Sequence, residues 1–325
     1  MADSGVPLLD RFPALRKLPR VTLCTLPSPV ELLPSMGGAG DIWIKRDDLN
    51  APVGGGNKVR TLEFLLGNVK PGDAVLTVGG AGSNHVLATA IHAARLGATA
   101  TAFRWKHDMN PAADLTAARI AVEMPGMRVG KSAVIAVARA RLRGLSAEVH
   151  YIPLGGSSPL GALGHVNAAL ELAAQIEAGE MPRPDQIVLP LGSGGTAAGL
   201  LLGFALAGLD VTIVGARVGP RFFASRYRVL GLAHQTARLI ERLTGERLPA
   251  VDRSRLRIAH QVYGGAYGRP LAVATEAAAT LKDATGIQVD ATYSAKAFVA
   301  ALDEARAARG PTLFWLTFDA RCLTN

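Results

Sequence analysis

Short apolar runs of strand length alternate with longer helical patterns almost from end to end of the chain, and this alternation restricts the fold more than any other feature. A strand followed by a helix and a second strand predicts parallel sheets with right-handed crossovers. The expected strands are 42–45, 74–78, 99–103, 149–152, 186–189, 211–215, 257–262 and 312–316. The expected helices are 58–66, 84–96, 111–123, 160–178, 196–207, 221–243, 270–284 and 295–308. The predicted class is α/β.

The composition agrees with this class. Hydrophobic residues make up 49% of the 325 residues and aromatic residues only 5%, so the core must consist mainly of Ala, Leu, Val and Ile, which suits helices packed on parallel sheets. A chain of this length commonly divides into two domains. No Pro/Ser-rich linker separates two halves, so we expect the chain to pass between its domains more than once.

Charge and cysteine usage disfavour several functional classes. The 35 basic and 26 acidic residues give a net charge of +9, but no recognition motif accompanies the scattered arginines, so nucleic acid is not an expected partner. A basic surface instead favours an anionic substrate or a phosphorylated cofactor. Cys24 and Cys322 are too few and too far apart in sequence for a disulfide framework or a zinc site, and no metal is expected.

Segment 187–209 is uncharged and long enough to span a bilayer. Pro190 and the glycines of 192–195 interrupt it, so we expect a strand, a glycine loop and a helix, and no membrane partner. The first residues lack the pattern of a signal peptide, which predicts a cytoplasmic protein.

Lys58 lies in the segment Gly54-Gly55-Gly56-Asn57-Lys58-Val59-Arg60, where a run of glycines meets the start of a predicted helix. Glycines let the backbone approach a flat ligand, and an amine presented there can form a Schiff base. This heptapeptide alone is also compatible with an ordinary solvated lysine. The rest of the chain must therefore decide between the two interpretations.

Two further loops stand at joints between a strand and a helix, where open α/β sheets bind ligands. Ser83, Asn84 and His85 open one helix, and their free N–H groups with a hydroxyl predict a carboxylate site, although capping of the helix explains Ser83 and Asn84 as well. The segment Gly192-Ser193-Gly194-Gly195-Thr196 opens another helix. It matches neither the nucleotide P-loop nor the dinucleotide motif, which leaves a lone phosphate monoester or a plain glycine turn.

Tyr267 and Tyr293 stand in predicted loops, where flanking glycines suggest that they point into a cleft, although each tyrosine alone is better explained as a packing residue. Together with Lys58, the phosphate loop and the hydroxyl-rich helix start, they describe a pyridoxal phosphate site. In such a site a lysine holds the aldehyde and a glycine loop holds the phosphate.

On these residues the chain resembles the fold type II (tryptophan synthase beta-like) pyridoxal-phosphate enzymes that include D-cysteine desulfhydrase and 1-aminocyclopropane-1-carboxylate deaminase. The matching segments, in the family's order, are 44–49, 55–60, 82–85, 155–161, 192–196 and 267–268. The resemblance implies two open, twisted, mostly parallel sheets flanked by helices. It implies a small domain, 53–164, inserted into a large cofactor-binding domain made of 1–52 and 165–325. It also implies a homodimer.

The resemblance assigns roles to single residues. Lys58 would be the Schiff-base lysine and Asn84 would bond the 3′ oxygen of the cofactor, while Ser83, Asn84 and His85 would bind the substrate carboxylate. The catalytic set would be Lys58, Ser83, Tyr267 and Tyr293, with Tyr267 also touching the substrate. The cofactor would contact Asn57, Lys58, Asn84, Gly192, Ser193, Gly194, Gly195, Thr196 and Thr317.

The chain departs from the family pattern after the last strand. Thr317 keeps a hydroxyl expected to face the pyridine nitrogen, but Phe318 adds bulk and Asp319 a charge where relatives have glycines. Asp319 could reach the ring or end the strand at the surface. Ser294 replaces the glutamate of the aminocyclopropane deaminases, which weakens a ring-opening assignment.

Two more positions bear on the substrate. His165 stands where a tyrosine is expected. The basic segment from Arg217 to Arg221 follows a core strand, and it could either contact an acidic substrate or be solvated at the surface.

The resulting hypothesis is a lyase that releases ammonia and a keto acid from a small amino acid by β-elimination, as D-cysteine desulfhydrase does. Freed Lys58 would remove the Cα proton. The alternatives are an aminocyclopropane deaminase, a cysteate sulfo-lyase, a racemase on the same scaffold, and a cofactor-binding protein without turnover.

Overall fold

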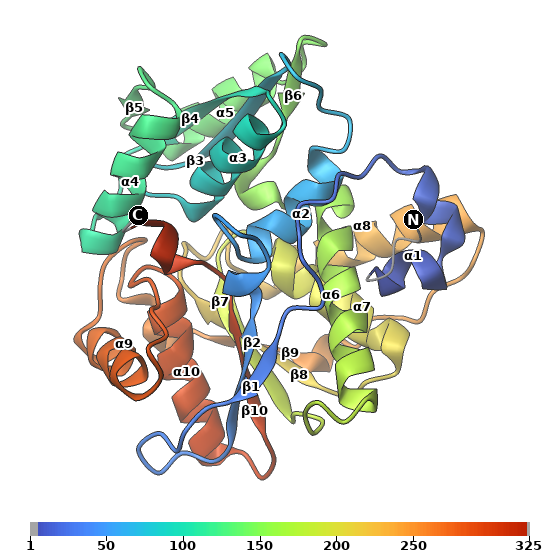
Figure 1. Cartoon of the computed structure of the whole chain (residues 1–325), viewed down its shortest axis with the longest axis vertical. Helices are drawn as coiled ribbons and strands as arrows, with labels where there is room; N and C mark the ends of the chain where they lie inside the picture. The colour runs from blue at the N-terminus through green and yellow to red at the C-terminus, as the bar shows by residue number, and fades with distance from the viewer. Residues whose placement is uncertain (1–5, 324–325) are drawn as a thin grey trace.

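The computed structural model describes residues 6–323, which form two sheets, the smaller above the larger in Figure 1. The larger sheet has, in spatial order, β1 (Val30–Leu32), β2 (Ile42–Arg46), β10 (Thr312–Leu316), β7 (Gln186–Leu191), β8 (Thr212–Arg217) and β9 (Leu256–Ala259). All its pairs are parallel except the antiparallel pair of β1 and β2. The smaller sheet has the parallel strands β5 (Val129–Gly130), β4 (Thr99–Trp105), β3 (Ala74–Gly80) and β6 (Val149–Tyr151).

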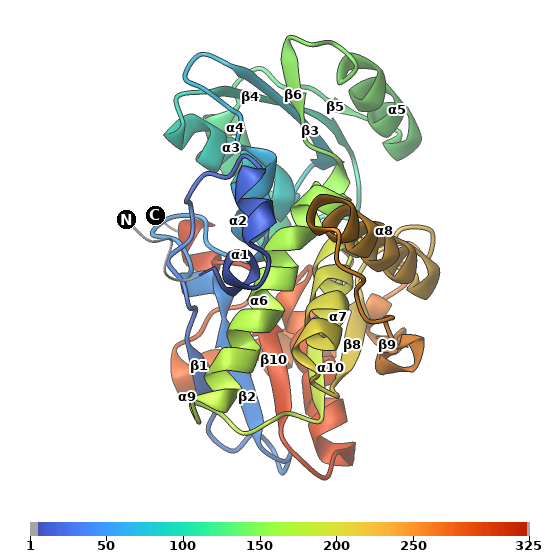
Figure 2. The ribbon, with the colours of Figure 1, turned by 90° about the vertical axis from the view of Figure 1, so that its right-hand side faces the viewer.

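Helices cover both faces of each sheet. The helices are α1 (Pro7–Arg11), α2 (Asn57–Leu65), α3 (Asn84–Arg95), α4 (Pro111–Glu123), α5 (Ala133–Arg143), α6 (Pro159–Glu177), α7 (Gly195–Ala207), α8 (Arg226–Thr244), α9 (Ala272–Thr285) and α10 (Ser294–Ala307). On the larger sheet, α9 and α10 pack against one face and α6, α7 and α8 against the other (Figures 1 and 2). On the smaller sheet, α3 and α4 lie opposite α5.

The predicted α/β class and its mostly parallel sheets are confirmed, and each expected strand and helix is present at a closely similar position. Helix α8 begins at Arg226 rather than at 221, because a turn follows Pro220 and the side chain of Ser225 caps the helix by accepting the N–H of Arg228. In segment 187–209, a strand, a loop and a helix are found as predicted. Across residues 6–323, no helix combines the length and apolarity needed to cross a membrane.

Sequence reasoning missed β1, β5, α1 and α5. Helix α5 is the largest omission, and its surface explains why. Val134, Ile135 and Leu142 are exposed apolar residues, so the helix lacks the one-sided apolar stripe that would reveal it.

The strands of the smaller sheet fall between residues 74 and 151, inside the predicted inserted domain, 53–164. The exact domain boundaries remain a prediction. Helix α2 packs against α6 beneath the smaller sheet (Figure 1), so the start of α2, which carries Lys58, lies where the two sheet units meet.

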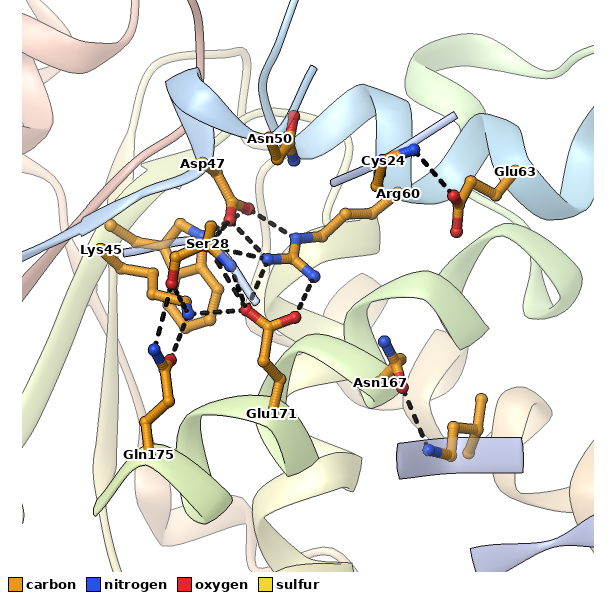
Figure 3. A network of polar contacts seen from close by, with 12 residues as sticks. Cys24, Ser28, Lys45, Asp47, Asn50, Arg60, Glu63, Asn167, Glu171 and Gln175 are labelled. Atoms are coloured by element: carbon orange, nitrogen blue, oxygen red, sulfur yellow. Dashed lines mark hydrogen bonds and ion pairs between the residues drawn. The ribbon is translucent and has the colours of Figure 1, made fainter. Parts of the chain in front are cut away.

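A buried network of charges holds α2 in this position (Figure 3). Arg60 Nη2 lies 2.7 Å from Asp47 Oδ1, and its Nη1 lies 2.9 Å from Glu171 Oε2 on α6. Lys45 Nζ on β2 lies 2.6 Å from Glu171 Oε1, and Trp315 Nε1 on β10 donates to Asp47 Oδ2 (2.8 Å). Because two cations face two carboxylates, each buried charge is paired, which the low-dielectric interior requires.

Candidate active site

A cavity of about 300 Å³ lies between the two sheet units, at the carboxyl ends of β3, β4, β7, β8 and β10. This is the edge at which open α/β sheets bind ligands. Every residue predicted from the sequence to act at the site lines this one cavity. These residues are Asn57, Lys58, Ser83, Asn84, His85, Gly192, Ser193, Gly194, Gly195, Thr196, Tyr267, Tyr293 and Thr317.

Lys58 is in the first turn of α2, with its side chain partly accessible from the cavity. Its Nζ donates a hydrogen bond to the carbonyl oxygen of Gly155 (3.2 Å), and burial lowers the pKa of the amine to about 8. No carboxylate contributes to this shift, so the desolvated ammonium loses its proton more readily. A neutral amine is the nucleophile that an aldehyde requires.

The loop that carries Lys58 is joined to the predicted phosphate loop. Asn57 Nδ2 donates to Thr196 Oγ1 (2.7 Å). His165 Nε2 lies 3.3 Å from the same Oγ1 and 3.0 Å from Thr61 Oγ1. His165, which stands where a tyrosine was expected, is therefore buried behind the loop and is not among the residues that line the cavity.

The segment from Gly192 to Thr196 forms the turn between β7 and the N-terminus of the 13-residue helix α7. Gly194 has a φ of 90°, which favours glycine. A Cβ on Gly195 would lie 2.7 Å from Ser157 Oγ, so only a glycine keeps the cradle open. Ser157 Oγ accepts the N–H of Gly195 (3.1 Å) and donates to Ser193 Oγ (2.7 Å). These donors at a helix start suit a phosphate monoester, so the cradle fits pyridoxal phosphate.

The start of α3 supplies the second polar wall. Ser83 occupies the N-cap position, yet its side chain makes no capping hydrogen bond, so the alternative that Ser83 merely caps the helix is wrong. Its hydroxyl lies in the cavity within hydrogen-bond reach of the hydroxyl of Tyr293, beside the N–H groups of the first turn. An N-terminus of this kind favours a carboxylate.

His85 is neutral and buried. Its Nε2 lies 2.8 Å from Thr77 Oγ1. Burial, aided by the charge of Lys58, lowers the pKa of His85 to about 3, although a hydrogen bond to the carbonyl oxygen of Pro153 acts to raise it. A neutral ring offers a carboxylate no charge, so His85 would help to bind one through its backbone N–H at the start of α3.

Tyr267 and Tyr293 face each other with hydroxyls in short hydrogen-bond contact and ring centroids 6.0 Å apart. Burial raises the pKa of Tyr267 to about 12 and that of Tyr293 well above its ordinary value. Both phenols therefore keep their protons at neutral pH. The carboxylate of Asp290 accepts the N–H of Tyr293 (2.8 Å) and holds this tyrosine at the start of α10.

Two residues that sequence reasoning missed place the tyrosines. Asn110 Nδ2 donates to the carbonyl oxygen of Gly268 (2.7 Å) and to Thr292 Oγ1 (2.9 Å), so one amide reaches the loops of both tyrosines. The ring of His107 lies 4.5 Å from that of Tyr267, centroid to centroid. The Asn-Pro pair at 110–111 indicates a helix N-cap. No sequence pattern around it indicates that Asn110 also contacts the loops that carry Tyr267 and Tyr293.

Phe318 and Asp319, which depart from the family pattern after β10, do not line the cavity. Thr317 lines it as predicted, whereas Phe318 packs among Val86, Leu87 and other core residues. Asp319 is buried and pairs with Arg321 (2.7 Å), so it neither lies at the surface nor lines the cavity. Both expectations for Asp319 are therefore wrong.

The basic segment from Arg217 to Arg221 was expected to contact an acidic substrate or to be solvated at the surface. Arg221 is exposed, in agreement with solvation, and neither arginine is among the lining residues. Arg217 is instead buried, with its guanidinium 3.8 Å from the ring centroid of Tyr263. Among the described residues, no group of His, Cys, Asp and Glu could hold a metal ion.

Comparison with known proteins agrees with this geometry. Residues 21–317 match the model of the family described as "Pyridoxal-phosphate dependent enzyme". The nocardicin C-9′ epimerase of Nocardia uniformis subsp. tsuyamanensis is 39% identical over 94% of each chain. The D-cysteine desulfhydrase of Salmonella paratyphi B is 30% identical over 95% of this chain and 96% of its own. A crystal structure of an aminocyclopropane-carboxylate deaminase homologue superposes with a TM-score of 0.76 at 30% identity, covering 96% of this chain and 94% of the other. The resemblance predicted from the sequence is confirmed, and the chain belongs to the pyridoxal-phosphate dependent enzymes, with the fold type II architecture.

Proposed function

We propose that this enzyme removes the Cα proton of a small amino acid and then expels a substituent from Cβ, releasing a keto acid and ammonia, as a D-cysteine desulfhydrase does. One observation carries the proposal. The desolvated amine of Lys58, the unpaired start of α3 and the protonated pair of Tyr267 and Tyr293 all face one cavity. These groups are a base, a carboxylate site and proton donors, which are the parts that the reaction needs.

The cofactor would be held by four groups of residues. Lys58 would bind it covalently through Nζ, and the loop from Gly192 to Thr196 would hold its phosphate. Asn84 would bond its 3′ oxygen and Thr317 would face its ring nitrogen. Bound pyridoxal phosphate supplies an electron sink for the charge that develops at Cα.

Lys58 is suited to act as the general base once the substrate amine has displaced it. With a pKa of about 8, about a tenth of its amine is neutral at pH 7, far more than for an ordinary lysine. The hydroxyl of Ser83 and the first-turn N–H groups from Asn84 onward would fix the carboxylate and so aim the Cα–H bond at Nζ. Tyr267 and Tyr293 keep their protons and could donate one to the departing group.

The residues that line the cavity also bear on the alternative substrates and on the alternative of a binder without turnover. Among its lining residues, Lys58 is the only lysine or arginine, so a sulfonate leaving group would lack a second cation, and cysteate is disfavoured. Ser294 stands where the aminocyclopropane deaminases have a glutamate, and it is not among the lining residues. The assignment of a ring-opening reaction is therefore weakened. Phe318 and Asp319 point away from the cavity, which removes the reason to expect a binder without turnover.

An epimerase is the second candidate, and the relative that is 39% identical over 94% of each chain favours it. The two functions share the removal of the Cα proton and differ in the fate of the resulting carbanion. An epimerase returns a proton to the other face of Cα, from a donor such as Ser83 or the tyrosine pair, whereas a lyase expels the Cβ group.

One set of measurements tests the proposal. The purified wild type should show the visible absorption of a lysine-bound cofactor, and K58A should lose it. The surface substitution K282A is the control, because Lys282 is exposed on α9. Keto acid release from D- or L-cysteine supports the lyase. Exchange of the Cα proton in D₂O with inversion and no keto acid supports the epimerase, and a colourless wild type contradicts both.

A homodimer and a cytoplasmic location are further proposals, which rest on the resemblance and on the sequence. Sedimentation of the purified enzyme at several concentrations tests the first. Fractionation of the source cells tests the second.

A further inference from the structure

The cavity has a part that none of the proposed roles uses. When the residues proposed to hold the cofactor, the substrate carboxylate and the moving protons are set aside, apolar side chains dominate the remaining lining. They are Trp105, Ala133, Leu154, Pro190, Leu191, Ala197, Pro220, Phe223 and Ala266, and five of them form the walls considered next: Trp105, Ala133, Leu154, Pro220 and Phe223. The only carboxylate in the lining belongs to Asp108.

These residues come from two facing walls. Trp105 ends β4, Ala133 begins α5 and Leu154 follows β6, so the smaller sheet unit provides one wall. Pro220 and Phe223 lie between β8 and α8 and provide the other. Figure 2 shows α5 and α8 on the same side of the molecule, which is consistent with walls that face each other.

The apolar walls begin next to the reacting groups. Trp105 is paired in register with Gly80 of β3. A Cβ on Gly80 would lie 2.6 Å from the ring of His107 and 2.9 Å from that of Tyr267, so this strand end is adjacent to the tyrosine pair. A substrate with its carboxylate at Ser83 and its Cβ near the tyrosines would extend its side chain between these walls.

The apolar character continues outward from both walls. Phe222, next to Phe223, is 80% exposed, and Val134, next to Ala133, is 78% exposed. The two polar side chains in this part of the lining already have partners, since His107 Nε2 accepts the N–H of Gly82 and the carboxylate of Asp108 pairs with Arg269. A polar substituent would therefore lose its hydration without a free partner, whereas an apolar one would gain by burial.

We infer that the enzyme selects substrates whose Cβ carries an aromatic or bulky aliphatic substituent, which packs between Trp105 and Leu154 on one wall and Pro220 and Phe223 on the other. This inference rests on the proposed function only for the carboxylate at the start of α3 and for Lys58 as the base. In an elimination the apolar substituent is the group that leaves an otherwise small amino acid, and in an epimerisation it is the side chain that the product retains.

Exchange of the Cα proton tests the inference without requiring a leaving group. The holoenzyme is incubated in D₂O with alanine, serine, leucine and phenylalanine as both enantiomers, and exchange is followed by NMR. The expected kcat/KM for phenylalanine or leucine exceeds that for alanine or serine by about tenfold or more, since each buried methylene contributes about tenfold or more to discrimination.

The substitution F223A should lower the ratio of phenylalanine to alanine exchange by about tenfold, the scale of a removed apolar contact in a pocket. Y227A is the matched control, because Tyr227 is an aromatic residue of α8 that is 90% exposed, and it should leave the ratio unchanged. Faster exchange of serine or alanine than of phenylalanine, with no effect of F223A on the ratio, would overturn the inference.

A second readout does not depend on turnover. Calorimetric titration of the wild type with 3-phenylpropanoate and with propanoate compares two carboxylates that differ only in the apolar group. The phenyl compound should bind at least tenfold more tightly, and F223A should reduce this preference. If none of these amino acids exchanges its proton and cysteine releases no keto acid, the proposed function fails, and the calorimetric preference alone then supports or overturns the inferred side chain.

Discussion

The backbone N–H of Asn57 donates a hydrogen bond to the carbonyl oxygen of Thr317 (3.1 Å), which joins the residue before Lys58 to the segment after β10. The N–H of Asp319 donates to the carbonyl oxygen of Gly55 (3.1 Å), and Gly56 forms a bridge with Phe318. The loop that presents Lys58 is thereby paired with the segment that presents Thr317. Two sides of the proposed cofactor site are fixed relative to each other by backbone hydrogen bonds.

This pairing makes Gly56 critical. Its φ is +135°, and a Cβ there would lie 2.4 Å from the carbonyl oxygen of Thr317. We expect G56A to separate the two segments and to lower the free energy of unfolding by about 1–3 kcal/mol, the cost of a strained backbone conformation. Cofactor absorbance per protomer and chemical denaturation measure the two effects. G72A is the control, since Gly72 also has a positive φ but has no atom within 4 Å of its Cβ position. Equal cofactor content in both variants would contradict the expectation.

The lowered pKa of Lys58 predicts a pH dependence for cofactor binding. Only the neutral amine reacts with an aldehyde, so the rate at which the apoenzyme binds pyridoxal phosphate should rise with pH. The midpoint should lie near 8 instead of the 10.5 of an ordinary lysine. Stopped-flow absorbance across this range measures it.

Lys296 provides a control for this experiment. Burial also lowers its pKa to about 8, but its amine donates to the carbonyl oxygen of Tyr263 (3.1 Å) and is not among the lining residues. K296M should therefore keep the absorbance change that K58A loses. If K296M instead lost the absorbance change and K58A kept it, the cofactor would be bound by Lys296 and not by Lys58.

Asn110 is predicted to position the tyrosine pair. N110D keeps the oxygen that caps α4 by accepting the N–H of Ala113, but it loses the donor to Gly268 and Thr292. We expect kcat/KM to fall by about 10- to 100-fold, since small displacements of reacting groups have effects of this size. The absorption of the bound cofactor should stay the same, and the alkaline limb of the pH profile should shift as the tyrosines move.

S132A is the matched control for N110D. It removes the cap of α5, whose oxygen accepts the N–H of Ile135, and Ser132 is not among the cavity residues. Its effect should be a loss of about 1 kcal/mol of stability, as for other helix caps, without a change in the pH profile. If N110D and S132A changed the pH profile equally, Asn110 would act only as a helix cap and would not position the tyrosines.

The buried network predicts a large loss of stability for R60A. This variant leaves the carboxylates of Asp47 and Glu171 buried without their partner, which should lower the free energy of unfolding by about 3–5 kcal/mol. R16A removes an exposed pair with Asp10 and should change the stability by at most about 1 kcal/mol. Urea denaturation at neutral pH compares the two.

The effect of R60A should also depend on pH. Burial is the largest single effect and acts to raise the pKa of Asp47 and of Glu171, but the charges of Arg60 and Lys45 and the hydrogen bonds to these carboxylates together outweigh it and hold both pKa values below their ordinary range. A lowered carboxyl pKa stabilises the fold above the unfolded value of about 4 and loses this contribution as the pH falls through the folded value. The difference between wild type and R60A should therefore shrink in acid. A difference that is constant with pH would contradict the electrostatic explanation.

Much of the site could be predicted because its parts are local. The glycines before Lys58 and the loop from Gly192 to Thr196 stand at strand-to-helix joints, and parallel strands bring such joints to one edge of a sheet. The role of Ser83 needed the structure, because a cap and a free hydroxyl have the same sequence pattern. The directions of Phe318 and Asp319 also needed it, since adjacent side chains leave a turn in directions set by the residues packed around them.

The sequence by itself determined the alternation of strands and helices, the positions of the glycine loops and hence the family. Hydrophobic periodicity and turn-forming residues depend on a few consecutive positions, so both can be recognised in the sequence. Only the tertiary structure decided that Asn110 reaches both tyrosine loops, that Arg60 joins Asp47 to Glu171, and that the free part of the cavity is apolar. These contacts join segments more than a hundred residues apart or different sheet units, and they arise from packing, which no local pattern records.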